Sequence, residues 1–138
     1  MMENEHALRA RICQVGRLMH QFQWVDGVSG NISARLDAER LLVTPSGHAK
    51  GFMTPNDLLI IDLAGQVLAP LDRPDLKPTS EILMHLEVYH KRPDVGGVVH
   101  AHPPNAVALS IAGISVQSYA VPETLLLLGE VPTTPYAT

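Results

Sequence analysis

Two histidines separated by one residue, His100 and His102, form the sharpest chemical feature of the sequence. They follow the apolar pair Val98 and Val99 and precede two prolines, so they lie where a predicted strand ends. Residues i and i+2 of a strand project from the same face, and two imidazoles can therefore converge on one ion. Zinc accepts neutral imidazole nitrogen, and catalytic zinc sites combine three protein ligands with an open position. In isolation such a pair is more often two histidines brought together by chance, but its place at a strand end and the neighbouring motifs strengthen the expectation of a divalent-metal site.

A carboxylate and two hydroxyl residues stand together at a predicted helix start: Thr79, Ser80 and Glu81 follow Lys77-Pro78. One interpretation is structural, because Thr79 is a good N-cap and Glu81 suits the positive end of the helix dipole. The other is functional, because free N–H groups and hydroxyls at a helix N-terminus bind phosphate and a nearby carboxylate can act as general base. The residues alone favour the cap and leave the second interpretation open.

Two glycine-containing turns are weaker candidates. The segment 27–31, Gly-Val-Ser-Gly-Asn, is either a turn into a strand or a backbone cradle for an anion, since glycine allows close approach. It matches neither the dinucleotide-binding fingerprint nor the P-loop. The segment 44–47, Thr-Pro-Ser-Gly, is equally ambiguous on its own. The remaining histidines are expected to be solvated or structural: His6, His20, His48, His85 and His90.

Hydrophobic spacing predicts the elements that must position these residues. Apolar residues recur three or four apart from Leu8 to Phe22, which indicates an amphipathic helix that ends at the turn Asp26-Gly27. Further helices are predicted from Thr79 to Lys91 and over 106–112, and strands over 32–36, 41–44, 58–63, 67–68, 95–100 (of the buried type) and 115–121. Strand pairs joined by hairpins and interleaved with helices predict a mixed α/β layer fold with much of the sheet antiparallel.

The bulk composition narrows the class of protein. A chain of 138 residues fits one domain, and 46% apolar with 17% charged residues argues against disorder. A net charge of -4 gives no basis for binding nucleic acid or an anionic membrane, so an anionic ligand requires a local site. The single cysteine, Cys13, and an N-terminus without a signal-peptide pattern favour a cytoplasmic protein. The longest aliphatic run, 125–128, is too short to span a bilayer.

Taken in order, the motifs resemble the class II aldolase/adducin family. The segments that carry the resemblance are Gly30-Asn31-Ile32-Ser33, Thr44-Pro45-Ser46-Gly47, Pro78-Thr79-Ser80-Glu81, Arg92-Pro93-Asp94-Val95, Val98-Val99-His100-Ala101-His102-Pro103 and Pro135-Tyr136-Ala137-Thr138. The likeness runs from about Leu8 to the end of the chain. It implies a three-layer α/β/α fold around a central, largely antiparallel mixed sheet, with residues 1–138 as one domain. It also implies a homotetramer with active sites at subunit interfaces.

The resemblance assigns roles to individual residues. It implies that His100 and His102 bind zinc or another divalent metal, that Glu81 is the catalytic acid/base, and that Tyr119 reaches a neighbouring subunit's site. The positions that match phosphate-binding residues are Asn31, Ser46, Gly47, Thr79 and Ser80. The family's third histidine ligand and its C-terminal helices lie downstream of the segment 135–138. The chain is therefore expected to be the N-terminal portion of a longer protein with its C-terminal part missing.

The activity implied by the resemblance is that of a zinc-dependent aldolase, a lyase that cleaves a phosphorylated ketose such as L-fuculose 1-phosphate to dihydroxyacetone phosphate and an aldehyde. The alternatives are a sugar-phosphate 4-epimerase, a dehydratase or a decarboxylase of the same family, or a non-catalytic adducin-like interaction module. Val28 stands where the fuculose-phosphate aldolases tend to have a hydroxyl residue, and Thr79 where serine is common, which leaves the substrate open. The expected partner is a small-molecule sugar phosphate, with no nucleic acid and no membrane.

Overall fold

The computed structural model describes residues 4–116 and 122–135 of the chain. The chain divides into two compact units, Met1–His102 and Pro103–Thr138, and each is described by itself. Within the described residues, no helix is long and apolar enough to cross a membrane.

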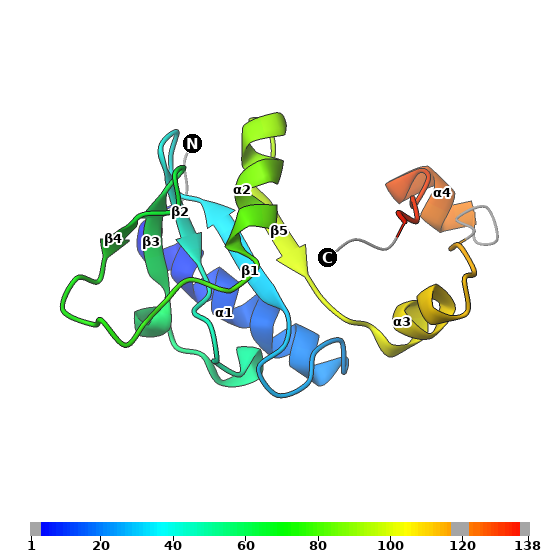
Figure 1. The fold of residues 1–138 in the computed structure, drawn as a ribbon, viewed down its shortest axis with the longest axis horizontal. Coiled ribbons are helices and arrows are strands. Elements are labelled where there is room, and N and C mark those ends of the chain that lie inside the picture. The colour runs from blue at the N-terminus through cyan, green and yellow to red at the C-terminus, as the bar shows by residue number, and fades with distance from the viewer. Residues whose placement is uncertain (1–3, 117–121, 136–138) are drawn as a thin grey trace. The chain divides into compact units, whose positions relative to one another are not determined.

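A five-stranded sheet forms the centre of the first unit (Figure 1). Its strands are β1 (Asn31–Arg35), β2 (Arg40–Val43), β3 (Leu59–Asp62), β4 (Val67–Ala69) and β5 (Gly97–His100). Their order in space is β4-β3-β2-β1-β5, and all four neighbouring pairs are antiparallel. The chain winds back and forth through β1 to β4 and then returns to place β5 beside β1. The predicted, largely antiparallel sheet is confirmed.

The helix α1 (Glu5–Gln21) covers one face of this sheet. Its buried residues Ile12, Cys13 and Met19 share an apolar cluster with Ile32 and Ala34 of β1. The spacing of these helix residues follows the 3.6-residue repeat that predicted the helix. Two short 3-10 helices, η1 (Lys50–Phe52) and η2 (Pro55–Asp57), lie beside α1.

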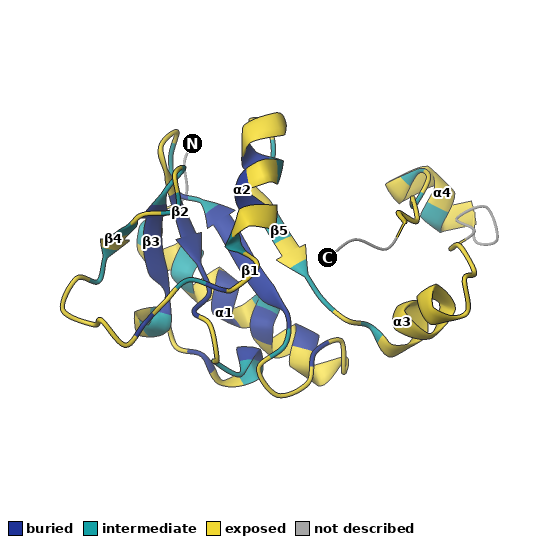
Figure 2. Ribbon diagram, viewed as in Figure 1, coloured by how far each residue is buried: buried dark blue, intermediate teal, exposed yellow. Residues whose placement is uncertain are grey.

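The helix α2 (Ile82–Lys91) covers the opposite face. Its residues Leu86 and Tyr89 pack in a second cluster with Leu41, Val43 and Ile61. Because neighbouring residues of a strand point to opposite faces, the two clusters lie on the two sides of the sheet. Figure 2 shows the buried residues gathered in the strands between the helices. The first unit is therefore the predicted three-layer α/β/α arrangement.

The start of α2 differs from the prediction. The helix begins at Ile82 rather than at Thr79, and Glu81 occupies the N-cap position without a side-chain capping bond. The Thr79 N–H donates to the Thr44 carbonyl at 3.2 Å, which holds Thr79 in an extended pairing outside the helix. The Thr79 hydroxyl accepts from the Glu81 N–H at 3.4 Å, within the turn that precedes the helix. The prediction that Thr79 caps the helix was therefore wrong.

The strand β5 also differs from the prediction of a buried strand. Its four residues alternate between exposed and partly buried, and Val99 is 54% exposed. In the described part of the chain β5 pairs on one side only, with β1. One of its faces meets the α2 cluster through Val98, and the other is left open. A strand at the edge of the sheet accounts for this pattern.

The second unit contains α3 (Pro104–Ile111) and α4 (Pro122–Leu128), and neither helix has a buried residue (Figure 2). The first of these follows the predicted helix and ends before Gly113, whose φ of 69° suits glycine. The sequence did not predict α4. Of the strand predicted over 115–121, Ser115 and Val116 are not in a strand, and 117–121, with Tyr119, lie outside the described residues.

Candidate active site

The pairing of β1 with β5 places the first predicted site residues side by side. Asn31 is directly opposite His100 in the antiparallel register. Both residues point to the face covered by α2, because Ser33 and Val98, two positions away in their strands, pack on that side. Glu81, at the start of α2, meets them there: its Oε2 lies 3.4 Å from His100 Nε2.

The two imidazoles of the His-x-His motif converge as the strand geometry predicts. The Nε2 atoms of His100 and His102 are 2.7 Å apart, and the two rings lie edge to face with centroids 4.8 Å apart. The His102 N–H donates to the Trp24 carbonyl at 2.7 Å, which fixes the residue beyond the end of β5. The His100 side chain is 26% exposed, and His102 is exposed, so both side chains reach solvent.

The donor set fits a divalent cation. Imidazole nitrogen and carboxylate oxygen are the ligands of zinc and of several neighbouring metals. Tetrahedral zinc with nitrogens at about 2.0–2.1 Å would hold two of them roughly 3.3 Å apart, so the rings of His100 and His102 need to open by roughly 0.6 Å. Residues 4–116 and 122–135 contain no cluster of three or more His, Cys, Asp or Glu side chains that could hold an ion. Two imidazoles alone fall short of the three protein ligands of a catalytic zinc site.

The Asn31 side chain connects Glu81 to the interior. Its Nδ2 donates to Glu81 Oε2 at 2.5 Å, while its Oδ1 faces His85 Nε2 at 2.5 Å. Asn31 is only 2% exposed, whereas the Glu81 side chain is 44% exposed. The buried amide thus holds a carboxylate that is open to solvent and to a ligand.

Behind Asn31 lie three polar residues that the sequence did not mark as functional. Ser33 Oγ is 2.6 Å from His85 Nδ1 and 2.8 Å from the Tyr89 hydroxyl. His85 is fully buried, and this burial lowers its pKa; the nearby His100 acts in the same direction, and the Glu81 carboxylate opposes it. Burial raises the pKa of the Tyr89 hydroxyl.

A sequence signal for this group exists. Glu81, His85 and Tyr89 are spaced four residues apart, which places them on one face of a helix. Asn31 and Ser33 are two apart, which places them on one face of a strand. Each pattern is common alone, and only the packing of α2 on β1 shows that they meet. The expectation that His85 is structural is consistent with its burial but omits its contact with Asn31.

The segments predicted to bind phosphate lie next to one another. Ser46 N–H donates to the Lys77 carbonyl at 2.8 Å, and Thr79 pairs with Thr44 as described above. The Thr44 hydroxyl in turn accepts from the Ile32 N–H at 3.1 Å, which ties these segments to β1. Among the predicted residues, three are exposed, Ser46, Gly47 and Ser80, and two are buried, Asn31 and Thr79. The exposed three are accessible to solvent.

The buried side chain of Lys50 connects the turn 27–31 to His48, the residue that follows the turn 44–47. It is 2% exposed, and its Nζ donates to the Val28 carbonyl at 3.0 Å and to the His48 carbonyl at 2.5 Å. Burial lowers the pKa of its ammonium group. Its local sequence carries no signal of this role, because the carbonyls that it binds belong to two separate loops.

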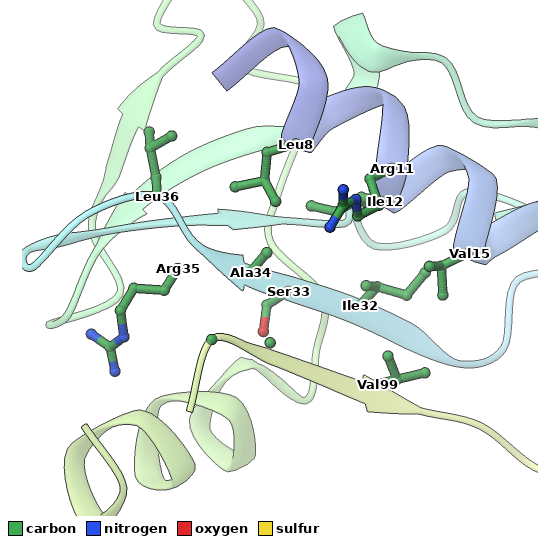
Figure 3. A pocket seen from close by; sticks show the side chains of 12 residues that line it. Leu8, Arg11, Ile12, Val15, Ile32, Ser33, Ala34, Arg35, Leu36 and Val99 are labelled. Carbon is green, nitrogen blue, oxygen red and sulfur yellow. The ribbon is translucent and has the colours of Figure 1, made fainter. Parts of the chain in front are cut away.

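A cavity of about 390 Å³ lies on the other side of β1 (Figure 3). Its apolar lining includes Leu8 and Ile12 of α1, Ile32 and Ala34 of β1, and Val99 of β5. These strand residues alternate with Asn31, Ser33 and His100, so they point away from Glu81. Ser33 and Arg35 also line the cavity, whereas Asn31, Glu81, His100 and His102 do not.

Comparisons with known proteins identify the family of this chain. The model of the class II aldolase and adducin N-terminal domain matches residues 10–138. The methylthioribulose-1-phosphate dehydratase of Pseudomonas savastanoi pv. phaseolicola is 42% identical over 103 residues, which are 75% of this chain and 48% of that protein. That of Pseudomonas aeruginosa strain PA14 is 40% identical over 110 residues, 80% of this chain and 52% of that protein. The chain spans about half the length of these curated relatives.

Solved structures show the same fold. YgbL of Escherichia coli superposes with a TM-score of 0.85 and 30% identity, over 97% of this chain and 64% of that one. The L-fuculose-1-phosphate aldolase of Thermus thermophilus superposes with a TM-score of 0.63 and 36% identity, over 75% of this chain and 50% of that one. With a family model that covers nearly its whole length, the chain belongs to the class II aldolase and adducin N-terminal domain family.

Proposed function

We propose that this chain forms part of a metal-dependent lyase that acts on a phosphorylated ketose, and that the reaction is a dehydration. The observation that carries the proposal is the position of the Glu81 carboxylate. The Asn31 amide holds it at 3.4 Å from His100, which adjoins His102. A solvent-accessible acid/base beside two convergent imidazoles suits proton transfer next to a polarised carbonyl.

The choice of dehydration over aldol cleavage rests on the relatives. The curated proteins at 40–43% identity over three quarters or more of this chain are methylthioribulose-1-phosphate dehydratases. Structures named L-fuculose 1-phosphate aldolase are similar at 23%, 24% and 36% identity. The relatives thus support the dehydratase alternative better than the fuculose-phosphate aldolase activity expected from the sequence. Aldol cleavage is the second candidate.

The chemistry of dehydration assigns two tasks to Glu81. A ketose has an acidic C–H bond next to its carbonyl and a hydroxyl on the following carbon. The Glu81 carboxylate accepts the proton from that C–H bond, and the same carboxyl group then returns a proton to the departing hydroxyl, which leaves as water while a C=C bond forms. His100 and His102 would hold a divalent cation, which would supply a Lewis acid for the substrate carbonyl.

The other residues orient the substrate. Ser46, Gly47 and Ser80 are the exposed positions that offer hydrogen bonds to the substrate phosphate. Binding the phosphate at a distance from the reacting carbons fixes the carbon chain relative to Glu81. An oligomeric assembly in which Tyr119 reaches a neighbouring site belongs to the same proposal.

The test is the variant Glu81→Gln in the full-length protein. It should abolish turnover and leave the metal content unchanged, because the amide keeps the shape of the carboxylate but cannot accept the proton. Glu87→Gln is the matched control on α2, since Glu87 is exposed and its ion pair with Lys91 lies on the helix surface. Retained turnover in Glu81→Gln would refute the role of Glu81.

The substrate assay separates the candidate activities. Loss of water from methylthioribulose 1-phosphate supports the dehydratase, whereas cleavage of L-fuculose 1-phosphate supports the aldolase. Chelation of the metal should stop either reaction. Full-length protein that binds no zinc or other divalent metal, and that turns over neither compound, would instead be a non-catalytic interaction module.

A further inference from the structure

The hydrogen bonds behind Glu81 form one continuous series, and the donor and the acceptor of each bond can be assigned. Asn31 Oδ1 can only accept, so His85 Nε2 must carry the proton in the contact between them. If the amide of Asn31 were turned over, its oxygen would face the Glu81 carboxylate, and two acceptors would be in contact. The Nδ2 group must therefore donate to Glu81.

The hydrogen bonds of Ser33 and Tyr89 are consistent with a His85 Nδ1 that carries no proton. The ring is fully buried and its burial disfavours the charged form, so with Nε2 protonated its Nδ1 is an acceptor. Ser33 then donates its hydroxyl proton to Nδ1, and the Ser33 oxygen accepts from the Tyr89 hydroxyl. Each residue of this series therefore donates to the next, in the order Tyr89, Ser33, His85, Asn31, Glu81.

We propose that His85 is a positioning residue: as its Nε2–H tautomer, it fixes the Asn31 amide so that Asn31 presents an N–H group to the Glu81 carboxylate. His85 does not touch substrate and acts only through Asn31. Its effect on turnover rests on the proposed function, whereas its tautomer and its hold on Asn31 do not.

The need for such a support follows from the setting of Glu81. This residue occupies the N-cap position of α2 without a capping bond, and its side chain is 44% exposed. The Asn31 amide is its short hydrogen-bond partner at 2.5 Å. If the contact from His85 is lost, the Asn31 amide can turn over and bring its oxygen against the carboxylate. Partners behind metal ligands affect activity by about 10- to 100-fold through this kind of orientation, and we expect a similar range for the support of Glu81.

Two substitutions of His85 by residues of similar size distinguish a positioning role from a packing role. In His85→Gln the side-chain amide reaches the place of Nε2 and can donate to Asn31. In His85→Asn the shorter amide can replace only Nδ1, so Asn31 loses its partner. We expect kcat to fall by about 10- to 100-fold in His85→Asn with KM little changed, and to be largely retained in His85→Gln. Equal kcat values in the two variants would overturn the proposal, because a packing role does not distinguish the two ring nitrogens.

A measurement on the unaltered full-length protein needs neither a variant nor turnover. With histidine labelled with nitrogen-15, NMR distinguishes a protonated from an unprotonated ring nitrogen. At neutral pH the ring of His85 should be uncharged, with its proton on Nε2. A proton on Nδ1 alone, or on both nitrogens, would overturn the inference. If the protein turned over no phosphorylated ketose, the proposed function would fail while this measurement still decided the tautomer of His85.

Discussion

The burial of His85 should make the stability of the fold depend on pH. Its pKa is lowered in the folded protein, chiefly because burial disfavours the imidazolium, so the folded state keeps the ring neutral when an exposed histidine takes up a proton. Below the ordinary histidine pKa of 6.5, the unfolded chain therefore binds more protons than the folded one. The free energy of unfolding must decrease as the pH falls below about 6.5, until the folded-state pKa is reached.

The size of the effect follows from one proton. If the unfolded state titrates with a pKa of 6.5 and the folded state stays neutral, the loss between about pH 7 and about pH 5.5 is about 1.3 kcal/mol. This is an upper limit, because any protonation of His85 in the folded state reduces it. The ionisable groups that face the ring act in both directions: His100 disfavours its protonation, and Glu81 favours it. Tyr89, joined to it through Ser33, is uncharged in this range because burial raises its pKa.

The assay is chemical denaturation of the unaltered protein and of His85→Gln at both pH values. The variant has no group that titrates at this position, so the difference between the two losses isolates His85 from every other ionisable group. The unaltered protein should lose up to about 1.3 kcal/mol more than the variant. An equal loss in the two proteins, or a greater loss in the variant, would refute the conclusion that His85 is held neutral.

Two further pairs of variants test the loops around the site. Gly30 and Gly47 have nearly the same φ, 70° and 71°, but an added Cβ would overlap the Val25 side chain at Gly30 and meet nothing within 4 Å at Gly47. Thermal unfolding should therefore show that Gly47→Ala lowers the free energy of unfolding by about 1–2 kcal/mol. Gly30→Ala should lower it by about 1–3 kcal/mol more, and equal decreases in the two variants would contradict the overlap. Lys50→Met should lower the free energy of unfolding by about 1–3 kcal/mol, because two carbonyls lose their donor. Its control, Lys91→Met, should stay within about 0.5 kcal/mol, since that ion pair is exposed.

The first four strands could be predicted because the signals that set them are local. Alternating apolar residues and short turns define β1 with β2, and β3 with β4, and hairpins require no knowledge of distant residues. The start of α2 could not be predicted in this way. The helix begins at Ile82 and not at Thr79 because the backbone of Thr79 pairs with that of Thr44, which is far away in sequence. The open face of β5 likewise depends on where the strand joins the sheet.

The candidate site was predictable to the same extent. The spacing of the motif predicted the approach of His100 to His102. The strand itself ends at His100, and the bond to the Trp24 carbonyl holds His102 beyond it. The roles of the five predicted phosphate-binding residues, and of Tyr119, stay predictions. The amide of Asn31 has two partners, Glu81 and His85, that the sequence did not assign to it. Those contacts depend on which face of α2 packs on β1, which is a property of the tertiary structure.

The whole site depends on one register, that of β5 against β1. Asn31 faces His100, and a shift of one residue would turn the His100 side chain to the α1 side of the sheet, away from Glu81. The pattern of β5 itself specifies this register weakly, since its four residues include a glycine and an exposed valine. Something outside the apolar pattern must therefore fix it.

Backbone hydrogen bonds that flank the strand supply this constraint. Beyond one end of β5, the His102 N–H is bound to the Trp24 carbonyl at 2.7 Å. Before its other end, the Gly96 carbonyl accepts from the Arg35 N–H at 2.8 Å. A shift by one residue would break both bonds and leave polar backbone groups without partners, which costs far more than the weak side-chain pattern could recover. The positions of Glu81 and the two neighbouring imidazoles thus depend on backbone hydrogen bonds that flank β5 at both ends.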